Sequence, residues 1–208
     1  MKNLVIIDHP LIRRDLSTLR DRRTGTDQFR VTLRRVSTLV AFAVTNDFRL
    51  SLRLISTPLE KTKGYLLTDK VVLVPVLRAG LGMAEGFLDL LPEARVGHIG
   101  LYRDEDTLMP IDYYSKFPKR LSKSLILVLD PMLATGGSAS AAIRFIKKRG
   151  GKRIRLVSLV AAPEGVRKLN SDHGDVRIYA ASLDRRLNSR GYILPGLGDA
   201  GDRVFGTE

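Results

Sequence analysis

Short apolar runs alternate along the chain with longer stretches in which apolar residues recur every three or four positions. The runs are rich in Val, Leu and Ile, which is typical of strands that are buried on both faces of a sheet. We predict such strands over residues 71–77, 95–101, 124–129, 153–162 and 176–182. Because helical periodicity follows most of these runs, the pattern predicts an α/β fold with a mainly parallel sheet and helices on both faces.

The N-terminal part of the chain has the periodicity of helices rather than strands. One apolar stripe spans residues 11–19, and a second, longer stripe spans residues 29–44. His9 stands before Pro10 where the first helix begins, so we interpret it as a turn or cap residue rather than a catalytic group. Residues 50–56 alternate between apolar and polar types, which predicts a half-exposed strand or arm.

Residues 104–122 are polar and lack a regular pattern. Loops of this length without secondary structure are often lids, so we expect 104–122 to form a flexible lid, or hood. The segment begins with Asp104, Glu105 and Asp106, which suggests a divalent-metal site. Three consecutive acids cannot all face one ion, so we interpret them as solvated charge.

Length and composition set further limits. The 208 residues suit a single domain over residues 1–208, and we find no internal repeat or linker. The absence of cysteine excludes disulfides and thiolate metal sites. We find neither a signal peptide nor an apolar run of the roughly 20 residues that a membrane span needs, so we expect a cytoplasmic protein without a membrane partner.

The net charge of +13 requires an explanation. One interpretation is nucleic-acid binding, and the other is a solvated basic surface that attracts small anions. Lys and Arg are spread along the chain in short clusters without a long basic tract, which favours the second interpretation.

The strongest chemical signal lies between the predicted strand 124–129 and a predicted helix over 139–148. Asp130 follows the strand, and Thr135, Gly136, Gly137 and Ser138 lead into the helix. Glycines allow a ligand to approach the backbone, and the free N–H groups of a helix N-terminus bind phosphate. An ordinary strand-to-helix turn with a Ser/Thr cap is the alternative. The Gly-Lys-Ser/Thr ending of a P-loop is missing.

Two other stretches are candidates for the same edge of the sheet. Arg78 follows the strand 71–77 and precedes Gly80, which predicts either a second anion site or a structural ion pair. Residues 196–201 match the spacing G-x-G-x-x-G, but the chain ends at Glu208, without the acid that a dinucleotide site has about 20 residues further on. We interpret this stretch as a loop that offers backbone groups to a flat polar ligand.

These stretches resemble one family. Residues 130–138 resemble the 5-phosphoribosyl-1-pyrophosphate motif of type I phosphoribosyltransferases, with Pro131 where most members carry a second acid. That departure, together with residues 74–83, 102–103 and 191–203, resembles the uracil phosphoribosyltransferase family. The resemblance covers nearly the whole chain and implies a type I phosphoribosyltransferase-like fold with a hood and an N-terminal helical part.

The resemblance implies transfer of phosphoribosyl to uracil, which gives UMP and pyrophosphate in pyrimidine salvage. It implies Arg103, Asp130 and Asp199 as catalytic residues, and a C-terminal base-binding segment over 183–208. Donor-binding residues would be Arg78, Arg103, Asp130, Pro131, Met132, Leu133, Ala134, Thr135, Gly136, Gly137, Ser138 and Asp199. Uracil-binding residues would be Ile193, Gly198, Asp199 and Ala200.

The resemblance also implies Mg²⁺ that is held mainly by the substrate, GTP as an activator, and a homodimer or higher homo-oligomer. Two alternatives stay open: an RNA-binding regulator that keeps the fold, and a transferase for another base such as hypoxanthine or orotate. Orotate would need a cation for its carboxylate, and residues 192–201 contain none.

Overall fold

The computed structural model describes residues 2–103 and 110–207, without the side chains of 101–103 and 110–112. Within these residues a nine-stranded sheet has the order β1-β11-β10-β8-β4-β6-β7. Its main strands are β1 (Leu4–Ile6), β4 (Lys70–Leu77), β6 (His98–Arg103), β7 (Pro110–Lys116), β8 (Ser124–Leu129), β10 (Arg153–Ala161) and β11 (Arg177–Leu183). Short strands β5 (Arg95–Val96) and β9 (Met132–Leu133) pair with β4 and β10. All these pairs are parallel except β6 with β7.

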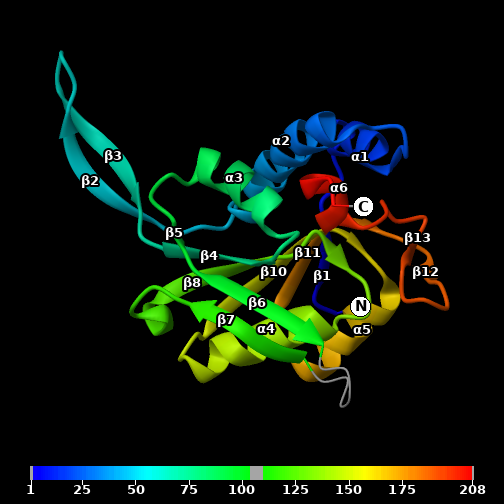
Figure 1. Cartoon of the computed structure of the whole chain (residues 1–208). Helices are drawn as coiled ribbons and strands as arrows, with labels where there is room; N and C mark the ends of the chain where they lie inside the picture. The colour runs from blue at the N-terminus through cyan, green and yellow to red at the C-terminus, as the bar shows by residue number, and fades with distance from the viewer. Residues whose placement is uncertain (1, 104–109, 208) are drawn as a thin grey trace.

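Helices cover both faces of the sheet (Figure 1). One layer contains α1 (Pro10–Arg20), α2 (Thr26–Val44), α3 (Leu81–Leu90) and α6 (Ala200–Phe205). The other contains α4 (Gly137–Lys148) and α5 (Pro163–Asp172). This arrangement confirms the predicted α/β fold with a mainly parallel sheet.

The two faces of each central strand enter two separate cores. In β8, Leu125, Leu127 and Leu129 pack in the core with α1, α2 and α3, whereas Ile126 and Val128 pack in the core with α4 and α5. Because successive side chains point to opposite faces, a strand between two helical layers must be apolar throughout. This explains the continuous apolar runs in the sequence.

The N-terminal helices form as predicted. Pro10 occupies the first turn of α1, where its missing N–H costs nothing. His9 is the N-cap, and its Nδ1 accepts a hydrogen bond from the Leu11 N–H at 3.2 Å. The interpretation of His9 as a cap residue is confirmed.

The predicted arm is one strand of a hairpin. β2 (Leu50–Ser56) pairs antiparallel with β3 (Lys61–Leu67), and every residue of β2 is exposed. The hairpin extends away from the rest of the molecule (Figure 1). We did not predict β3, because its Lys61-Thr62-Lys63 start carries little apolar signal.

The prediction that residues 104–122 are irregular is wrong for much of the segment. Residues 110–116 form β7, which pairs with β6, and a 3₁₀ helix (η1) spans Leu121–Lys123. Tyr113 and Tyr114 have high strand propensity, which the polar composition of the segment concealed. Residues 104–109, with the Asp-Glu-Asp cluster, lie outside the described residues.

Two smaller differences concern element boundaries. The predicted strand over 95–101 is divided into β5 and β6, with Gly97 between them. The glycine-rich tail loop is followed by the short helix α6, although the sequence suggested no helix there. In the described part of the chain, no helix is long and apolar enough to span a bilayer.

Candidate active site

The loop between β8 and α4 is held by the neighbouring strand β10. The Pro131 carbonyl accepts hydrogen bonds from two β10 N–H groups at 3.1 Å, and the Leu133 carbonyl accepts one from Ala162 at 2.8 Å. Gly136 precedes α4 with φ 81°, a conformation that favours glycine, and a Cβ there would lie 3.0 Å from the Gly165 carbonyl of α5. The backbone that leads into α4 is therefore held in one conformation.

The first turn of α4 has open space beside it. A Cβ on Gly137 would meet no atom closer than Thr135 Oγ1 at 3.7 Å, and the side chains of Thr135 and Ser138 are exposed. The first N–H groups of a helix have no partner within the helix, and its dipole makes this end positive. Amide groups, two hydroxyls and open space together form a suitable cradle for a phosphate.

Asp130 stands at the carboxyl end of β8, partly buried. Burial penalises its charged form and raises the pKa to about 6, although a hydrogen bond from the Met132 N–H at 3.3 Å opposes the shift. Among the described residues no ion pair involves Asp130. Its carboxylate is therefore available to accept hydrogen bonds from ligand hydroxyls.

Arg78 lies in the neighbouring loop, between β4 and α3. Gly80 of this loop sits against the end of β8, where a Cβ would clash with the Leu129 carbonyl. The exposed Arg78 side chain forms an ion pair with Asp202 of α6 at 3.2 Å, and its guanidinium lies 5.9 Å from the Phe205 ring centre. The structural ion pair that we considered for Arg78 is thus present.

The C-terminal loop begins after the two-residue strands β12 (Arg186–Leu187) and β13 (Ile193–Leu194). Ile193 and Ala200 are buried, whereas Gly198 and Asp199 are exposed. Asp199 is the N-cap of α6, and its Oδ1 accepts a hydrogen bond from the Asp202 N–H at 3.0 Å. This bond fixes the direction of the Asp199 carboxylate.

The three loops meet at one end of the sheet. A Cβ on Gly201 would lie 3.9 Å from Ala79 Cβ, which joins the C-terminal loop to the Arg78 loop. A Cβ on Gly191 would lie 3.7 Å from Thr135 Cγ2, which joins the same segment to the phosphate cradle. The structure thus brings together the loops that carry Arg78, Asp130, Thr135–Ser138 and Ala200, which are far apart in the sequence.

The family model for uracil phosphoribosyltransferase matches residues 5–207. The uracil phosphoribosyltransferases of Finegoldia magna and Thermosipho melanesiensis are each 54% identical to this chain, over 209 and 204 residues. These alignments cover all of both chains in the first case and 98% of both in the second. The chain belongs to the uracil phosphoribosyltransferase family.

Solved structures share the fold of this chain. A protein of Aquifex aeolicus is 37% identical with a TM-score of 0.93, over 99% of both chains. An adenine phosphoribosyl transferase from Trypanosoma brucei has a TM-score of 0.60 at 11% identity, over 88% of this chain and 84% of that one, which shows a shared fold. The expected type I phosphoribosyltransferase-like fold is therefore confirmed.

Arg103, which the uracil phosphoribosyltransferase resemblance singles out, lies at the end of β6. β6 runs parallel to β4, with Leu77 opposite Gly100, so the backbone of Arg103 emerges at the same end of the sheet as Arg78. The Arg103 side chain lies outside the described residues.

Sequence reasoning missed the cationic side chains beside the C-terminal loop. A cavity of about 300 Å³ adjoins this loop and is lined by Arg20, Arg22, Leu197, Gly198, Asp199, Asp202 and Arg203. We argued against orotate because residues 192–201 contain no cation, but three arginines from outside that range line this cavity. We considered residues 192–201 alone, and the cavity beside them also has cationic lining residues. No local pattern connects Arg20 with Gly198, because only the fold brings them together.

Proposed function

We propose that this protein transfers the 5-phosphoribosyl group of 5-phosphoribosyl-1-pyrophosphate to N1 of uracil, which gives UMP and pyrophosphate in pyrimidine salvage. The observation that carries the proposal is the convergence of the phosphate cradle, the Arg78 loop and the C-terminal loop at one end of the sheet. Ligands of open α/β sheets bind at the carboxyl ends of the strands. Membership of the uracil phosphoribosyltransferase family supports this activity.

The donor's two anionic groups would bind in separate loops. Thr135–Ser138, at the end of the 130–138 motif, would hold the 5′-phosphate on the N-terminus of α4. Arg78 and Arg103 would hold the pyrophosphate, and Asp130 would accept hydrogen bonds from the ribose hydroxyls. Arg78 must exchange Asp202 for pyrophosphate when the donor binds, because the two now form an ion pair.

Charge separation would govern the chemistry. Displacement at the anomeric carbon passes through an oxocarbenium-like state, with positive charge on the sugar and negative charge on the departing pyrophosphate. Arg78 and Arg103 would stabilise that negative charge, which is electrostatic rather than covalent catalysis. The N1 proton of uracil would pass to Asp199 or to the departing pyrophosphate, and an Asp199→Asn variant distinguishes these two acceptors.

Mg²⁺ would be held mainly by the donor's pyrophosphate and hydroxyls. Among the described residues there is no group of three or more His, Cys, Asp or Glu side chains that could hold a metal ion. Mg²⁺ usually keeps several waters and binds through substrate phosphates, so the proposal needs few protein ligands. Asp130 is the carboxylate that we propose for the ribose hydroxyls. When bound, the ion would neutralise part of the charge on the leaving pyrophosphate.

Base selection would depend on backbone groups of the C-terminal loop, at Ile193 and at Gly198, Asp199 and Ala200. Uracil presents an N3–H donor between two carbonyl acceptors, and cytosine reverses two of these roles. Fixed amide and carbonyl groups would remain unpaired with cytosine, and such a site rejects the mismatch by roughly 10⁴-fold. Orotate would need a cation for its carboxylate. Of the arginines that line the adjoining cavity, Arg20 is hydrogen-bonded to Asp184 and Arg203 to backbone carbonyls, so neither favours orotate.

The deciding experiment is turnover of the donor with uracil, cytosine, orotate and hypoxanthine, with each nucleotide product quantified by chromatography. We expect UMP from uracil and at least about 10⁴-fold lower kcat/KM for cytosine. A higher kcat/KM for orotate or hypoxanthine than for uracil would contradict the proposal.

The single-domain boundaries, the base-binding segment over 183–208 and the hood stay proposals. The hood over residues 104–122 would include β7, which pairs with β6 at the edge of the sheet. By excluding water, it would suppress hydrolysis of the donor. GTP activation stays a prediction to which we assign no residue.

We also propose that a second copy of the chain covers the β2–β3 hairpin. On one face of it, Leu50 lies opposite Leu67 and Leu52 lies opposite Tyr65, with Leu54 next in line. Their exposed fractions are 44–67%. A contiguous apolar face of this kind marks an interaction surface. This face supports the homodimer or higher oligomer that the resemblance implies.

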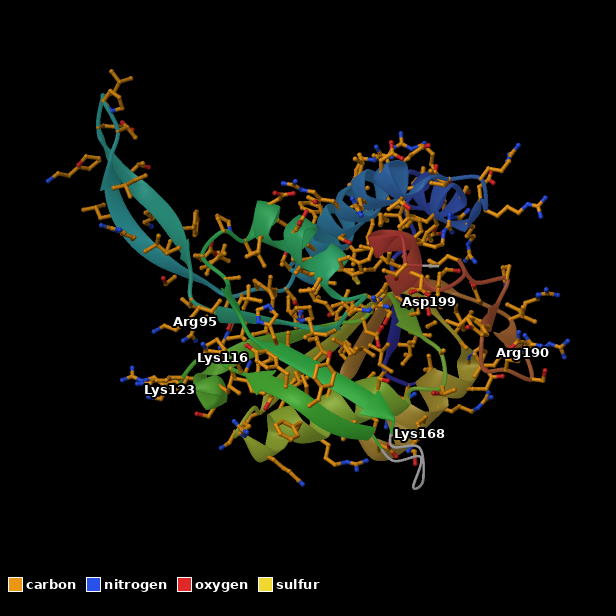
Figure 2. All side chains as sticks on the ribbon, viewed as in Figure 1. Arg95, Lys116, Lys123, Lys168, Arg190 and Asp199 are labelled. Carbon is orange, nitrogen blue, oxygen red and sulfur yellow. The ribbon has the colours of Figure 1, made fainter. Side chains whose placement is uncertain are left out.

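One observation favours the RNA-binding alternative as a second candidate function. Cations that are scattered in the sequence gather at the amino end of the sheet: Arg95 donates hydrogen bonds to the Lys119 carbonyl and to Ser124 Oγ, and Ser124 lies opposite Lys70. We name this basic surface by its exposed residues Lys70, Arg95, Lys116, Lys119, Arg120 and Lys123. None of the six forms an ion pair within the described residues. Figure 2 shows Arg95, Lys116 and Lys123 in one region and Asp199 far from them.

A salt titration of RNA binding tests this candidate. Phosphate contacts make the affinity fall steeply with salt, and each lost contact lowers the slope by about one. If the basic surface binds RNA, a variant with Lys119→Gln, Arg120→Gln and Lys123→Gln loses affinity and slope. The matched control removes three exposed cations from the hairpin (Arg53→Gln, Lys61→Gln, Lys63→Gln). Equal losses in both variants, or no binding by the wild type at 150 mM salt, would reject the candidate.

A further inference from the structure

A single ion pair holds both backbone polar groups of Gly196. The Gly196 N–H donates to Asp184 Oδ2 at 2.9 Å, and the Gly196 carbonyl accepts a hydrogen bond from Arg20 Nη1 at 2.8 Å. Arg20 and Asp184 bind each other through two further hydrogen bonds of 2.7 and 2.6 Å. Gly196 is therefore clamped two residues before Gly198.

The clamp is built from distant and rigid parts of the fold. Arg20 is the last residue of α1, and Asp184 directly follows β11. Asp184 is 6% exposed, and its N–H donates to the Ala161 carbonyl at 2.8 Å. Ser182 completes the set, since its Oγ donates to Asp184 Oδ1 at 2.8 Å and accepts from Arg20 at 3.1 Å. A bidentate pair of this kind is strongly directional.

A second arginine holds the next residue of the loop. Arg203 of α6 donates from Nη1 to the Leu197 carbonyl at 2.9 Å and also to the Leu19 carbonyl. Its Nη2 donates to the Asp21 carbonyl at 2.8 Å, and its guanidinium lies 4.5 Å from the ring centre of Phe29. The carbonyls at the end of α1 thus support Arg203, while Arg20 of the same helix end supports Gly196.

The conformation of the loop at this point also depends on two glycines. Gly196 has φ 62° and Gly198 has φ 78°, values that other residues rarely adopt. A Cβ on Gly196 would clash with the Ile193 carbonyl. A short loop with two such glycines has many accessible conformations when it is not held, so the clamp selects one of them.

We propose that Arg20 and Asp184 are positioning residues for base recognition: by fixing Gly196 they set the places of the backbone groups of residues 198–200 that pair with uracil. The inference rests on the proposed function, and neither side chain touches the base itself. A small displacement of recognition groups costs much binding, because hydrogen bonds to the base depend on direction and distance. Among the described residues, the hydrogen bonds of Arg20 and Asp184 do not reach the cradle of residues 135–138, so we expect donor binding there to be unaffected.

The test compares the KM for uracil with the KM for the donor in Asp184→Asn and Arg20→Lys. Asn keeps the size of Asp184 but loses its charge, and Lys keeps the charge of Arg20 but cannot form the fork. We expect the KM for uracil to rise about 10–100-fold in each variant while the KM for the donor stays within about twofold. The double variant should be no worse than the worse single one, because both changes break the same clamp.

The matched control is the exposed pair Arg13–Asp8, whose arginine lies in the same helix at 2.6 Å from its partner. Arg13→Lys and Asp8→Asn should leave both KM values unchanged. A merely structural role for the clamp would lower the melting temperature and leave the KM for uracil unchanged, or raise both KM values equally, and either result would overturn the inference. If Asp184→Asn does not fold, Arg20→Lys decides alone.

The outcome separates this inference from the proposed function. Turnover of uracil by the wild type, together with an unchanged KM for uracil in the variants, overturns only the positioning role. A wild type that does not use uracil overturns the proposed function itself.

Discussion

Arg78 and Asp202 form an ion pair of 3.2 Å that joins the loop after β4 to the first turn of α6. Both side chains are partly exposed to solvent, so the pair contributes at most about 1 kcal/mol. In the proposed function Arg78 leaves this partner for the pyrophosphate of the donor. The pair therefore competes weakly with donor binding.

We expect Asp202→Asn to lower the KM for the donor by up to about fivefold, because the Asp202 carboxylate no longer competes with the donor for Arg78. Arg78→Ala should raise the same KM and lower kcat/KM by about 10²-fold, the scale for losing one donor to the developing charge. Steady-state kinetics with varied donor and saturating uracil measure both effects. An increase of the donor KM in Asp202→Asn would show that Asp202 assists binding rather than competing with it.

Arg103→Ala should lower kcat/KM by roughly 10²–10³-fold, since Arg103 is proposed to stabilise the leaving pyrophosphate. The measurement is initial-rate kinetics of UMP formation, with circular dichroism as the control for folding. Near-wild-type kinetics in this variant would remove Arg103 from the mechanism.

The pKa of Asp130 links stability and activity to pH in opposite ways. Burial raises this pKa from 3.8 to about 6, so the carboxyl stabilises the fold fully below pH 3.8 and this contribution is lost as the pH rises through 6. Asp130→Asn avoids that loss. At pH 8 its free energy of unfolding should exceed that of the wild type by on the order of 2 kcal/mol. Urea denaturation at pH 8 and pH 4 measures this difference, which should shrink at pH 4.

Activity should follow the ionised form of Asp130. If this carboxylate accepts hydrogen bonds from the ribose, kcat/KM for the donor falls about tenfold per pH unit below pH 6. Asp130→Asn should lose donor turnover at every pH. A wild-type profile that stays flat down to pH 5 would contradict the assigned role.

Gly137→Val should abolish donor binding without unfolding the protein. A Cβ at this position meets no protein atom closer than 3.7 Å, so the valine would fill the space proposed for the 5′-phosphate. Isothermal titration with the donor measures the loss, and the melting temperature should change little. Gly136→Val is the matched contrast: it should lower the melting temperature, because φ is 81° there and Gly165 lies close. Unchanged donor affinity in Gly137→Val would place the phosphate elsewhere.

The hairpin face predicts the oligomeric state. Leu52→Glu together with Tyr65→Lys places charges on opposite residues of the apolar face, which should convert an oligomer into monomers. Light scattering after size-exclusion chromatography measures the mass. Arg53→Glu changes the other face of the same strand and should keep the wild-type mass. A wild type that is monomeric at micromolar concentration would contradict the proposed partner.

Local patterns in the sequence were sufficient for most of the fold. The runs that became β4, β8, β10 and β11 are apolar throughout because both faces of each strand are buried, and the cap at His9 and the helix start at Pro163 have short-range signals. β1, with three residues, and β7, with a polar composition, carry too little periodicity to be predicted.

The candidate site also has a part that the sequence predicts and a part that it does not. Asp130 and residues 135–138 were predictable, because a strand, an acid and a glycine-containing helix start lie next to each other in the sequence. The ion pair of Arg78 with Asp202 and the clamp of Arg20 with Asp184 join residues more than 120 positions apart. Such contacts depend on how the layers pack, and no local signal reports them.

The hydrogen bonds from Arg203 to the carbonyls at the end of α1 have a consequence for protein synthesis. A ribosome makes the N-terminal helices first, and Arg203, which joins them to the C-terminal loop, emerges about 180 residues later. In the proposed function, the donor cradle at α4 is therefore synthesised before the side chain that holds the base-binding loop. The proposed uracil-binding loop would then be the last part of the site to be completed.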